Sequence, residues 1–328
     1  MPRILFTLGD PAGIGPEIVL KALLPLRLGG HTSLGVVGPR RLWETAAREM
    51  GVLGPEDQGV EVIEPEGSED LTEERVREVL FSGEVSAAAG GLALASIETA
   101  ARRAGGDAGG TAIVTAPINK KAFRQAGADV PGHTEWLADF YGIPVPVMLL
   151  IGGGLRVAVG TTHVPLRDVA SRLDTDTLVS QLEVLHRDLE GRFGVAGPRI
   201  AVLALNPHGG AGGEPDIEER GILLPAIEEA RARGIQAEGL FSADGFFGRR
   251  RWEPFQAVLA PYHDQGLIPV KMEAAGAGVN VTLGLPVIRT SPDHGTAFDI
   301  AGRGVASEEA LLAAARMADV LLRGQGEG

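Results

Sequence analysis

Short apolar segments alternate along the chain with longer segments in which apolar residues recur at helical spacing. The short runs are Ile4–Leu8, Leu34–Val37, Ala112–Val114, Val147–Ile151, Arg156–Val159, Ile200–Leu205, Ala257–Ala260 and Val279–Thr282. The helical patterns are Glu17–Leu26, Ser86–Ala104, Thr175–Leu189, Ile217–Arg233 and Glu308–Leu322. Several short runs are apolar almost throughout, as in strands that are covered on both faces. The alternation therefore predicts an α/β fold with a mostly parallel, doubly covered sheet.

Length and composition agree with this fold class. A chain of 328 residues is long enough for two domains or one large α/β domain. Its 47 glycines and 21 prolines favour many tight turns between strands and helices. Residues Gly51–Asp70 are acidic and rich in turn formers, so we expect a surface connection containing one strand, Val60–Ile63. The C-terminal "GQGEG" is expected to be frayed.

Charge and cysteine content exclude several classes of site. The formal net charge of −13 argues against nucleic-acid binding, and an anion would need a local basic pocket. Without cysteine, any metal must be bound by histidine or carboxylate side chains. We see no leader peptide, and no apolar segment approaches the roughly 18 to 20 residues of a membrane span. The expected location is the cytoplasm.

Three of the seven histidines occupy equivalent positions. His163 in "LRVAVGTTHVPLRD", His208 in "LNPHGGAGG" and His263 in "APYHDQGLIPVK" each follow an apolar run, at the expected start of a loop. Ligands of open α/β sheets bind at the carboxyl ends of the strands, where three imidazoles could share one divalent metal ion. Each histidine could equally be a turn residue. His186 lies in a helical pattern and is expected to be structural or solvated, and His31 is expected in a turn.

Further polar residues suit an anionic ligand. In "PGHTEWLADFYG", His133 and Thr134 lie at an expected helix start, where Thr134 could be the N-cap or could contact an anion. Lys271, Asn280 and Arg289 follow at close intervals in a glycine-rich stretch. They could bind a phosphate or carboxylate, or they could be solvated.

Two glycine-rich loops are candidate cofactor sites. "FTLGDPAGIGPEIVLKAL" lacks the G-x-G-x-x-G pattern of dinucleotide-binding loops, and we expect only a tight strand-to-helix connection there. "SPDHGTAFDIAGRG" places His294, Gly295, Thr296 and Asp299 in a polar loop before the last helix.

Together these stretches resemble the 4-hydroxythreonine-4-phosphate dehydrogenase family of pyridoxal-phosphate biosynthesis. The matching segments are "GDPAGIGPE", "TAPINK", "PGHTEWLA", "TTHVPL", "LNPHGGAGGE", "APYHDQGLIPVK" and "GVNVTLGLPVIRTSPDHGTAFDIAG", in order over nearly the whole chain. The resemblance implies two α/β domains with a central cleft, as in isocitrate and isopropylmalate dehydrogenases. We place the cofactor-side domain at residues 1–128 plus 283–328, and the metal, substrate and dimerisation domain at 129–282.

The resemblance also implies roles for individual residues. His163, His208 and His263 look like the metal ligands, with the set completed across a homodimer interface. The positions that match substrate contacts are His133, Thr134, Lys271, Asn280 and Arg289, and the cofactor loop would contain His294, Gly295, Thr296 and Asp299. Lys271, Asp244 or a bound water could be the base. Asp264 would be the partner of an imidazole.

The implied activity is an NAD(P)-dependent oxidation of 4-phosphooxy-L-threonine followed by decarboxylation, with Zn, Co, Mn or Mg as the metal. Imidazole ligands favour Zn or Co over Mg. One alternative is a related dehydrogenase acting on phosphorylated threonate or erythronate, or on a carboxylated cis-dihydrodiol. The other is a non-catalytic protein that binds a metal or an anion.

Overall fold

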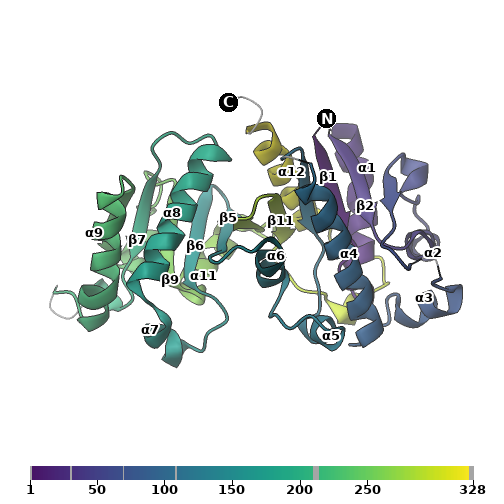
Figure 1. The fold of residues 1–328 in the computed structure, drawn as a ribbon, viewed down its shortest axis with the longest axis horizontal. Helices are drawn as coiled ribbons and strands as arrows, with labels where there is room; N and C mark the ends of the chain where they lie inside the picture. The colour runs from purple at the N-terminus through teal and green to yellow at the C-terminus, as the bar shows by residue number, and fades with distance from the viewer. Residues whose placement is uncertain (1, 30–31, 69, 108, 210–213, 325–328) are drawn as a thin grey trace. The chain divides into compact units, whose positions relative to one another are not determined.

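The computed structural model describes residues 2–29, 32–68, 70–107, 109–209 and 214–324 (Figure 1). The chain forms two compact units, which are described separately. Unit 1 runs up to Gly142 and resumes at Leu285, and unit 2 covers Ile143–Gly284. The expected turn at His31 and the expected fraying after Gly324 lie outside the described residues.

Unit 1 is built on a parallel sheet. Its strands follow the order β3-β2-β1-β4-β11, with bounds Glu61–Ile63, Ser33–Val37, Arg3–Thr7, Thr111–Thr115 and Ile288–Pro292. Leu5 in β1 lies opposite Gly35 on one side and Ile113 on the other, so the central strand is paired at both edges. The carboxyl ends of β1 and β4 therefore lie at the same edge of the sheet.

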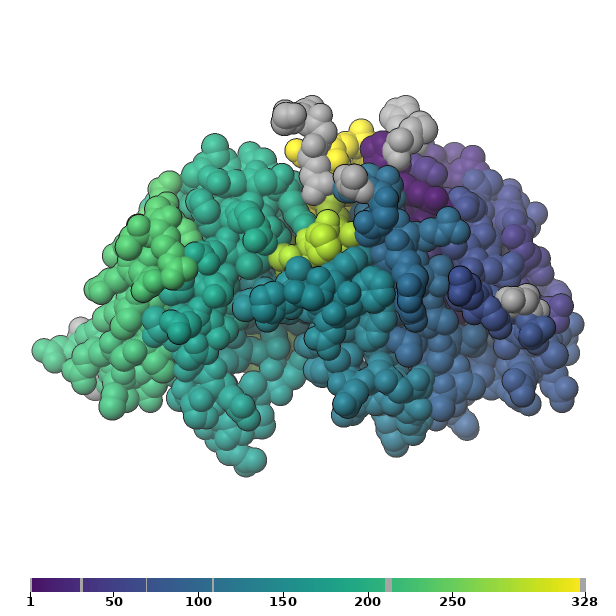
Figure 2. Space-filling model, in the orientation of Figure 1, coloured from purple at the N-terminus to yellow at the C-terminus, as the bar shows by residue number. Residues whose placement is uncertain are grey.

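Helices cover both faces of this sheet. They are α1 (Gly15–Gly29), α2 (Arg40–Met50), α3 (Glu73–Val79), α4 (Ala87–Gly105), α5 (Lys120–Gln125), α6 (His133–Tyr141) and α12 (Glu309–Gly324), with short 3₁₀ turns η1 (Glu56–Gln58) and η6 (Phe298–Ile300). α4 packs on β1, β2 and β4, whereas α12 packs on β1, β4, β11 and α1. α4 lies in front of the strands in Figure 1, and its outer face forms part of the surface in Figure 2.

Unit 2 contains a mixed sheet. Its strands follow the order β10-β5-β6-β9-β7-β8, with bounds Val279–Leu283, Val147–Gly152, Leu155–Thr161, Ala257–Tyr262, Arg199–Leu203 and Gln236–Phe241. β5 pairs antiparallel with β10 and β6, and the remaining pairs are parallel. The helices are α7 (Val169–Arg172), α8 (Thr175–Gly191), α9 (Leu224–Ala232), α10 (Ala243–Gly248) and α11 (His263–Ala274), with 3₁₀ turns η2 (Leu166–Asp168) and η3 (Pro207–Gly209) and a π-helical turn, η5 (Glu219–Leu223).

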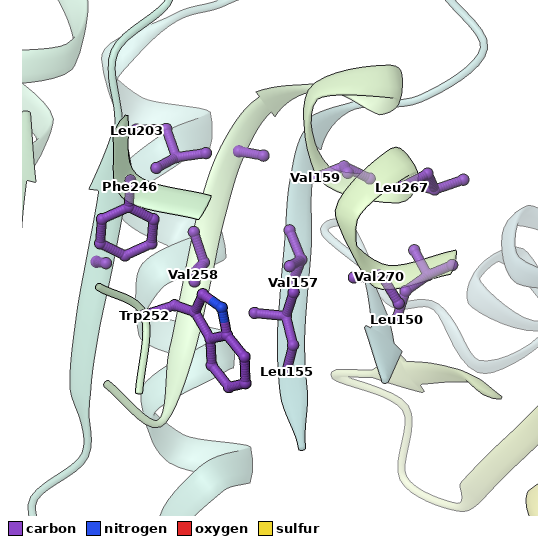
Figure 3. Packing of buried hydrophobic residues seen from close by; sticks show 12 residues of the cluster. Leu150, Leu155, Val157, Val159, Leu203, Phe246, Trp252, Val258, Leu267 and Val270 are labelled. Carbon is purple, nitrogen blue, oxygen red and sulfur yellow. The ribbon is translucent and has the colours of Figure 1, made fainter. Parts of the chain in front are cut away.

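α11 packs closely on the strand β6 (Figure 3). Val157 and Val159 point toward Leu267 and Val270 of α11 in one buried cluster, because alternate residues of a strand face the same side. At Gly266 a Cβ atom would lie 2.7 Å from Val157 Cγ1, so this helix position accepts no side chain without a shift. The close packing fixes the start of α11, where His263 is the first residue.

The mixed α/β fold class predicted from the sequence is confirmed, and every predicted strand and helical pattern corresponds to an observed element. Three predictions need correction. His263 was expected in a loop but begins α11. The N-cap of α6 is Gly132, not Thr134, which lies inside the helix. The Ile217–Arg233 pattern divides into the π-helical turn η5 and α9. Among the described residues, no helix is long and apolar enough to cross a membrane.

Candidate active site

Arg289 is a buried cation in the sheet of unit 1. It lies in β11 beside β4, is 3% exposed, and donates through Nε and Nη2 to the hydroxyl of Thr115, at 3.1 and 2.6 Å. Burial lowers the pKa of Arg289 to about 10, partly offset by the nearby carboxylate of Glu135. The guanidinium therefore stays charged at neutral pH.

His133 lies within the electrostatic reach of Arg289. It begins α6, is 7% exposed, and meets the ring of Phe123 edge-on with centroids 5.9 Å apart. Burial, and to a smaller extent the charge of Arg289, lower the pKa of His133 well below 6.5. Its imidazole is therefore neutral. Its Nε2 is buried without a hydrogen-bond partner among the described residues.

This pairing gives unit 1 two groups suited to binding an anion. A desolvated guanidinium attracts a phosphate or carboxylate strongly, and a neutral imidazole adds directed hydrogen bonding without requiring a second buried charge. Thr134, the next residue of α6, is 8% exposed. Three of the five predicted substrate contacts thus lie in unit 1.

The other two predicted substrate contacts, Lys271 and Asn280, lie in unit 2. Lys271 is an exposed residue of the last turn of α11. Asn280 lies in β10 opposite Leu150, and its buried Oδ1 has no hydrogen-bond partner among the described residues. A buried amide oxygen of this kind is costly unless a ligand or water satisfies it.

The three histidines predicted as metal ligands all lie in unit 2, at the carboxyl ends of neighbouring parallel strands. His163 follows β6, His208 follows β7, and His263 follows β9, which lies between the other two strands. The rings of His163 and His263 are 6.0 Å apart between centroids. His163 and His208 have left-handed backbones, with φ of 53° and 61°. Residues other than glycine adopt this region rarely, and examples cluster at functional sites.

His263 is oriented by its neighbour in the chain. Its Nδ1 lies 2.7 Å from Asp264 Oδ1, which leaves Nε2 available to a ligand. A carboxylate on one imidazole nitrogen is the usual arrangement when the other nitrogen binds a metal ion. His263 therefore has the orientation expected of one imidazole ligand of a cation.

His208 lies near Asp244 instead. The pKa of Asp244 is lowered chiefly by the hydroxyl of Ser242, then by the N–H of Gly245, with a smaller contribution from His208. Within the described ranges, no three histidine or carboxylate side chains gather closely enough to bind a metal ion. A single chain thus presents a His163–His263 pair and, separately, His208 beside Asp244.

The predicted cofactor loop lies in unit 1, against the turn that precedes α1. His294, Gly295 and Asp299 are exposed, and the space around Gly295 is open. The carbonyl of Thr296 accepts a hydrogen bond from Ile14 N at 3.0 Å. A Cβ at Gly13 would lie 2.5 Å from this carbonyl oxygen, so the "GDPAGIG" glycine permits close packing of the two loops. Open space beside exposed polar residues is compatible with a dinucleotide.

Comparison with known proteins identifies the family. The family model "Pyridoxal phosphate biosynthetic protein PdxA" matches residues 32–318. A 4-hydroxythreonine-4-phosphate dehydrogenase of Chromobacterium violaceum is 41% identical, over 98% of this chain and 97% of that protein. The chain belongs to the PdxA family.

One relative of equal sequence identity has a different name, whereas a similar solved structure has the same one. A putative D-threonate 4-phosphate dehydrogenase of Bradyrhizobium diazoefficiens is also 41% identical, over 98% of this chain and 97% of that protein. Among solved structures, a putative 4-hydroxythreonine-4-phosphate dehydrogenase from Salmonella typhimurium has a TM-score of 0.85 at 35% identity and covers 98% of this chain and 99% of its own. Membership of the PdxA family agrees with the resemblance seen in the sequence motifs.

Several residues around these sites were missed by the sequence analysis. Thr115 binds the guanidinium of Arg289, and Asp10 is 1% exposed with a pKa raised by burial. Asp10 lies in "GDPAGIGPE" and Thr115 begins the "TAPINK" segment, so both lie within recognised motifs. Thr115 meets Arg289 because β4 and β11, distant in the sequence, are neighbouring strands, whereas Asp10 accepts a hydrogen bond from Ala12 N two residues further on.

Proposed function

We propose that this chain is an NAD(P)- and divalent-metal-dependent dehydrogenase of pyridoxal 5'-phosphate biosynthesis. It oxidises 4-phosphooxy-L-threonine to 2-amino-3-oxo-4-phosphooxybutanoate, which decarboxylates to 3-amino-2-oxopropyl phosphate. The observation that carries the proposal is the buried cation Arg289 beside the neutral imidazole of His133. The names of relatives about 40% identical over almost the full length support the same activity.

The proposed substrate is a phosphorylated hydroxy amino acid with two anionic groups. Arg289, His133 and Thr134 would bind one of them in unit 1, with the guanidinium neutralising its charge. Lys271 and Asn280 are the proposed substrate contacts in unit 2. His133 and Asn280 each have a buried polar atom without a hydrogen-bond partner among the described residues, and a ligand in the respective unit would satisfy it, which supports both assignments.

His163, His208 and His263 are the proposed metal ligands. A divalent ion held by them would supply a Lewis acid that lowers the pKa of the C3 hydroxyl and offsets the negative charge of decarboxylation, and a bound nicotinamide would supply the hydride acceptor. Imidazole ligation favours Zn or Co over Mg. Asp264 would hold the His263 ring in the orientation that aims Nε2 at the ion.

Lys271 and Asp244 are the proposed candidates for moving the hydroxyl proton. Asp244 is a carboxylate at neutral pH and can accept a proton, and its lowered pKa makes it a weak base. The nicotinamide would lie against His294, Gly295, Thr296 and Asp299. The proposed enzyme acts in intermediary metabolism, which favours a cytoplasmic location for this protein.

A homodimer with shared active sites would complete the metal set. His163, His208 and His263 would then be brought to one ion from both protomers, with His263 serving the active site of the neighbouring subunit. Next to Asp244 and Asp264 lies a groove of about 430 Å³ lined mainly by apolar side chains. On α11, Ile268 and Met272 border it with exposed fractions of 59% and 77%, an apolar surface that a second copy would cover.

The proposal is tested by comparing substrates on purified, metal-replete protein. NADH or NADPH formation is measured with 4-phosphooxy-L-threonine, D-threonate 4-phosphate, D-erythronate 4-phosphate and a carboxylated cis-dihydrodiol. We expect the highest kcat/KM with 4-phosphooxy-L-threonine. A higher value with D-threonate 4-phosphate would assign the second candidate activity, which is favoured by the Bradyrhizobium relative. No turnover of any of them would reject both.

A further inference from the structure

The segment of residues 294–306, which contains the predicted cofactor contacts, is attached near its start to the turn before α1 and near its end to α1 itself. Near its start, the carbonyl of Thr296 accepts from Ile14 N, in the turn that leads into α1. Near its end, Gly304 and Ala306 are bound by Lys21 and Glu17, both within α1. Between these ends the segment has one short 3₁₀ turn and many exposed residues, and Phe298 packs on the cluster of Ala12, Val79 and Ala89.

Lys21 and Glu17 form more than a helical ion pair. The ammonium of Lys21 donates to Glu17 Oε1 at 2.8 Å, to the carbonyl of Gly304 at 2.8 Å and to the carbonyl of Ala306 at 2.7 Å. Three acceptors match its three N–H groups. Glu17 Oε1 also accepts from Ala306 N at 2.8 Å. Both charged side chains thus form hydrogen bonds with the backbone of a segment about 285 residues further along the chain.

Burial makes this arrangement costly. The side chain of Glu17 is 0% exposed and that of Lys21 is 21% exposed. An apolar pair of similar volume would avoid the desolvation of two charges and commonly gives equal or greater stability. What an apolar pair cannot do is bind the carbonyls of residues 304 and 306 and the N–H of residue 306. The charged pair therefore secures the position of one backbone segment.

We propose that Glu17 and Lys21 are positioning residues that hold residues 294–306 in the conformation that binds the nicotinamide cofactor. This inference rests on the proposed function, which assigns the cofactor to that segment. A loop that is ordered before binding loses less conformational entropy when the ligand arrives, which raises affinity without a new contact. Neither side chain needs to touch the cofactor.

The test uses the full-length protein and NAD and NADP as probes. Lys21→Met keeps the aliphatic stem and removes the three donors. Glu17→Gln keeps an acceptor and removes the charge. The double variant removes both charges, so that neither is left buried without its partner. Lys121→Met is the matched control, because Lys121 is an exposed lysine of α5 in the same unit. Cofactor dissociation constants are measured by calorimetry, and hydrogen exchange of residues 294–306 is followed without cofactor.

We expect Lys21→Met to raise the cofactor dissociation constant about tenfold, which corresponds to the ordering of one or two side chains or loop residues. Hydrogen exchange in residues 294–306 should be faster, while kcat at saturating cofactor stays within about twofold of wild type, as expected when only binding is lost. The Lys121→Met control should match wild type in both measurements.

Other outcomes overturn the inference in distinguishable ways. Wild-type cofactor affinity and exchange in a folded Lys21→Met or double variant would reject the positioning role and leave the proposed function intact. Failure of even the double variant to fold would show that the pair stabilises unit 1 as a whole, and this result would also reject the positioning role. Wild-type protein that binds neither NAD nor NADP would overturn the proposed function as well.

Discussion

Arg289 is the one arginine among the buried residues of the described chain, and its guanidinium reaches the hydroxyl of Thr115. Two parallel N–H groups in a fixed plane suit both this hydroxyl and an anionic ligand. A lysine would retain the positive charge and lose that geometry. The charge of Arg289 and its shape therefore make separable contributions to substrate binding.

The substitution Arg289→Lys tests the shape alone. Because hydrogen bonds to charged groups contribute about 1.5–3 kcal/mol, we expect kcat/KM for the phosphorylated substrate to fall roughly tenfold to a hundredfold, mainly through KM. Steady-state kinetics with purified protein measure this. Arg77→Lys, at an exposed position of α3, should behave as wild type. An unchanged KM in Arg289→Lys would exclude Arg289 from anion binding.

The buried His133 predicts a pH dependence of stability. Its pKa is far below 6.5 in the folded protein and near 6.5 in the unfolded chain. Above pH 6.5 neither state takes up the proton. As pH falls below 6.5, protonation of the unfolded chain lowers the free energy of unfolding by about 1.4 kcal/mol per pH unit, until the folded pKa is reached.

Urea denaturation at pH 5.0 to 7.5 measures this slope for wild type and for His133→Gln, whose side chain does not titrate. Below about pH 6.5, the free energy of unfolding of the variant should fall less steeply with decreasing pH, because one histidine fewer takes up a proton on unfolding. Equal slopes in the two proteins would show that His133 is not buried as a neutral group.

Sequence motifs pointed to Arg289, His133 and the three strand-end histidines, but not to the contacts among them. The motifs mark residue types and their place after strands. Whether two side chains meet depends on which strands are neighbours and on backbone conformation, such as the left-handed φ of His163 and His208. The roles of these residues in substrate and metal binding stay predictions.

At the scale of elements, regular apolar runs identified most strands, whereas α11 and β11 were missed for physical reasons. α11 contains Gly266 and Pro269, which both disfavour helix in isolated sequence. The helix forms because Leu267 and Val270 pack on β6. β11 carries Arg289 at a fully enclosed position, and a charged residue is atypical of a buried strand.

The close packing of α11 on β6 predicts the effect of Gly266→Ala. The added methyl group would meet Val157 Cγ1 at 2.7 Å, so the helix must shift, at a cost of about 1–3 kcal/mol in unfolding free energy. Urea denaturation measures the loss, and calorimetry should show weaker metal binding because His263 begins the same helix.

Gly191→Ala provides the control, because Gly191 ends α8 in the same unit and a Cβ there meets no atom within 4 Å. We expect its stability to stay within about 0.5 kcal/mol of wild type. Equal stabilities of the two variants would contradict the packing argument.

At the scale of the whole molecule, a shared metal site makes a prediction about mixed dimers. Homodimers of His208→Ala and of His263→Ala should each be inactive. In a mixed dimer of the two variants, one site would combine both substitutions, and the other would have all three histidines. With random reassociation, half of the dimers are mixed, so about a quarter of wild-type activity should return.

Mixing the two purified variants after mild dissociation, with activity and metal content as readouts, tests the arrangement. Static light scattering verifies that dimers re-form. If each site were built within one chain, no subunit would have a complete set and mixing would restore nothing. Self-mixed samples of each variant are the controls.

The left-handed backbones of His163 and His208 also bear on how the protein could be re-engineered. Asparagine and aspartate adopt this conformation more readily than most residues, whereas β-branched residues do so with difficulty. An exchange of imidazole for carboxylate at position 208 would therefore leave the chain path undisturbed. Since carboxylates favour Mg and Mn, one substitution there offers a direct route to a changed metal preference.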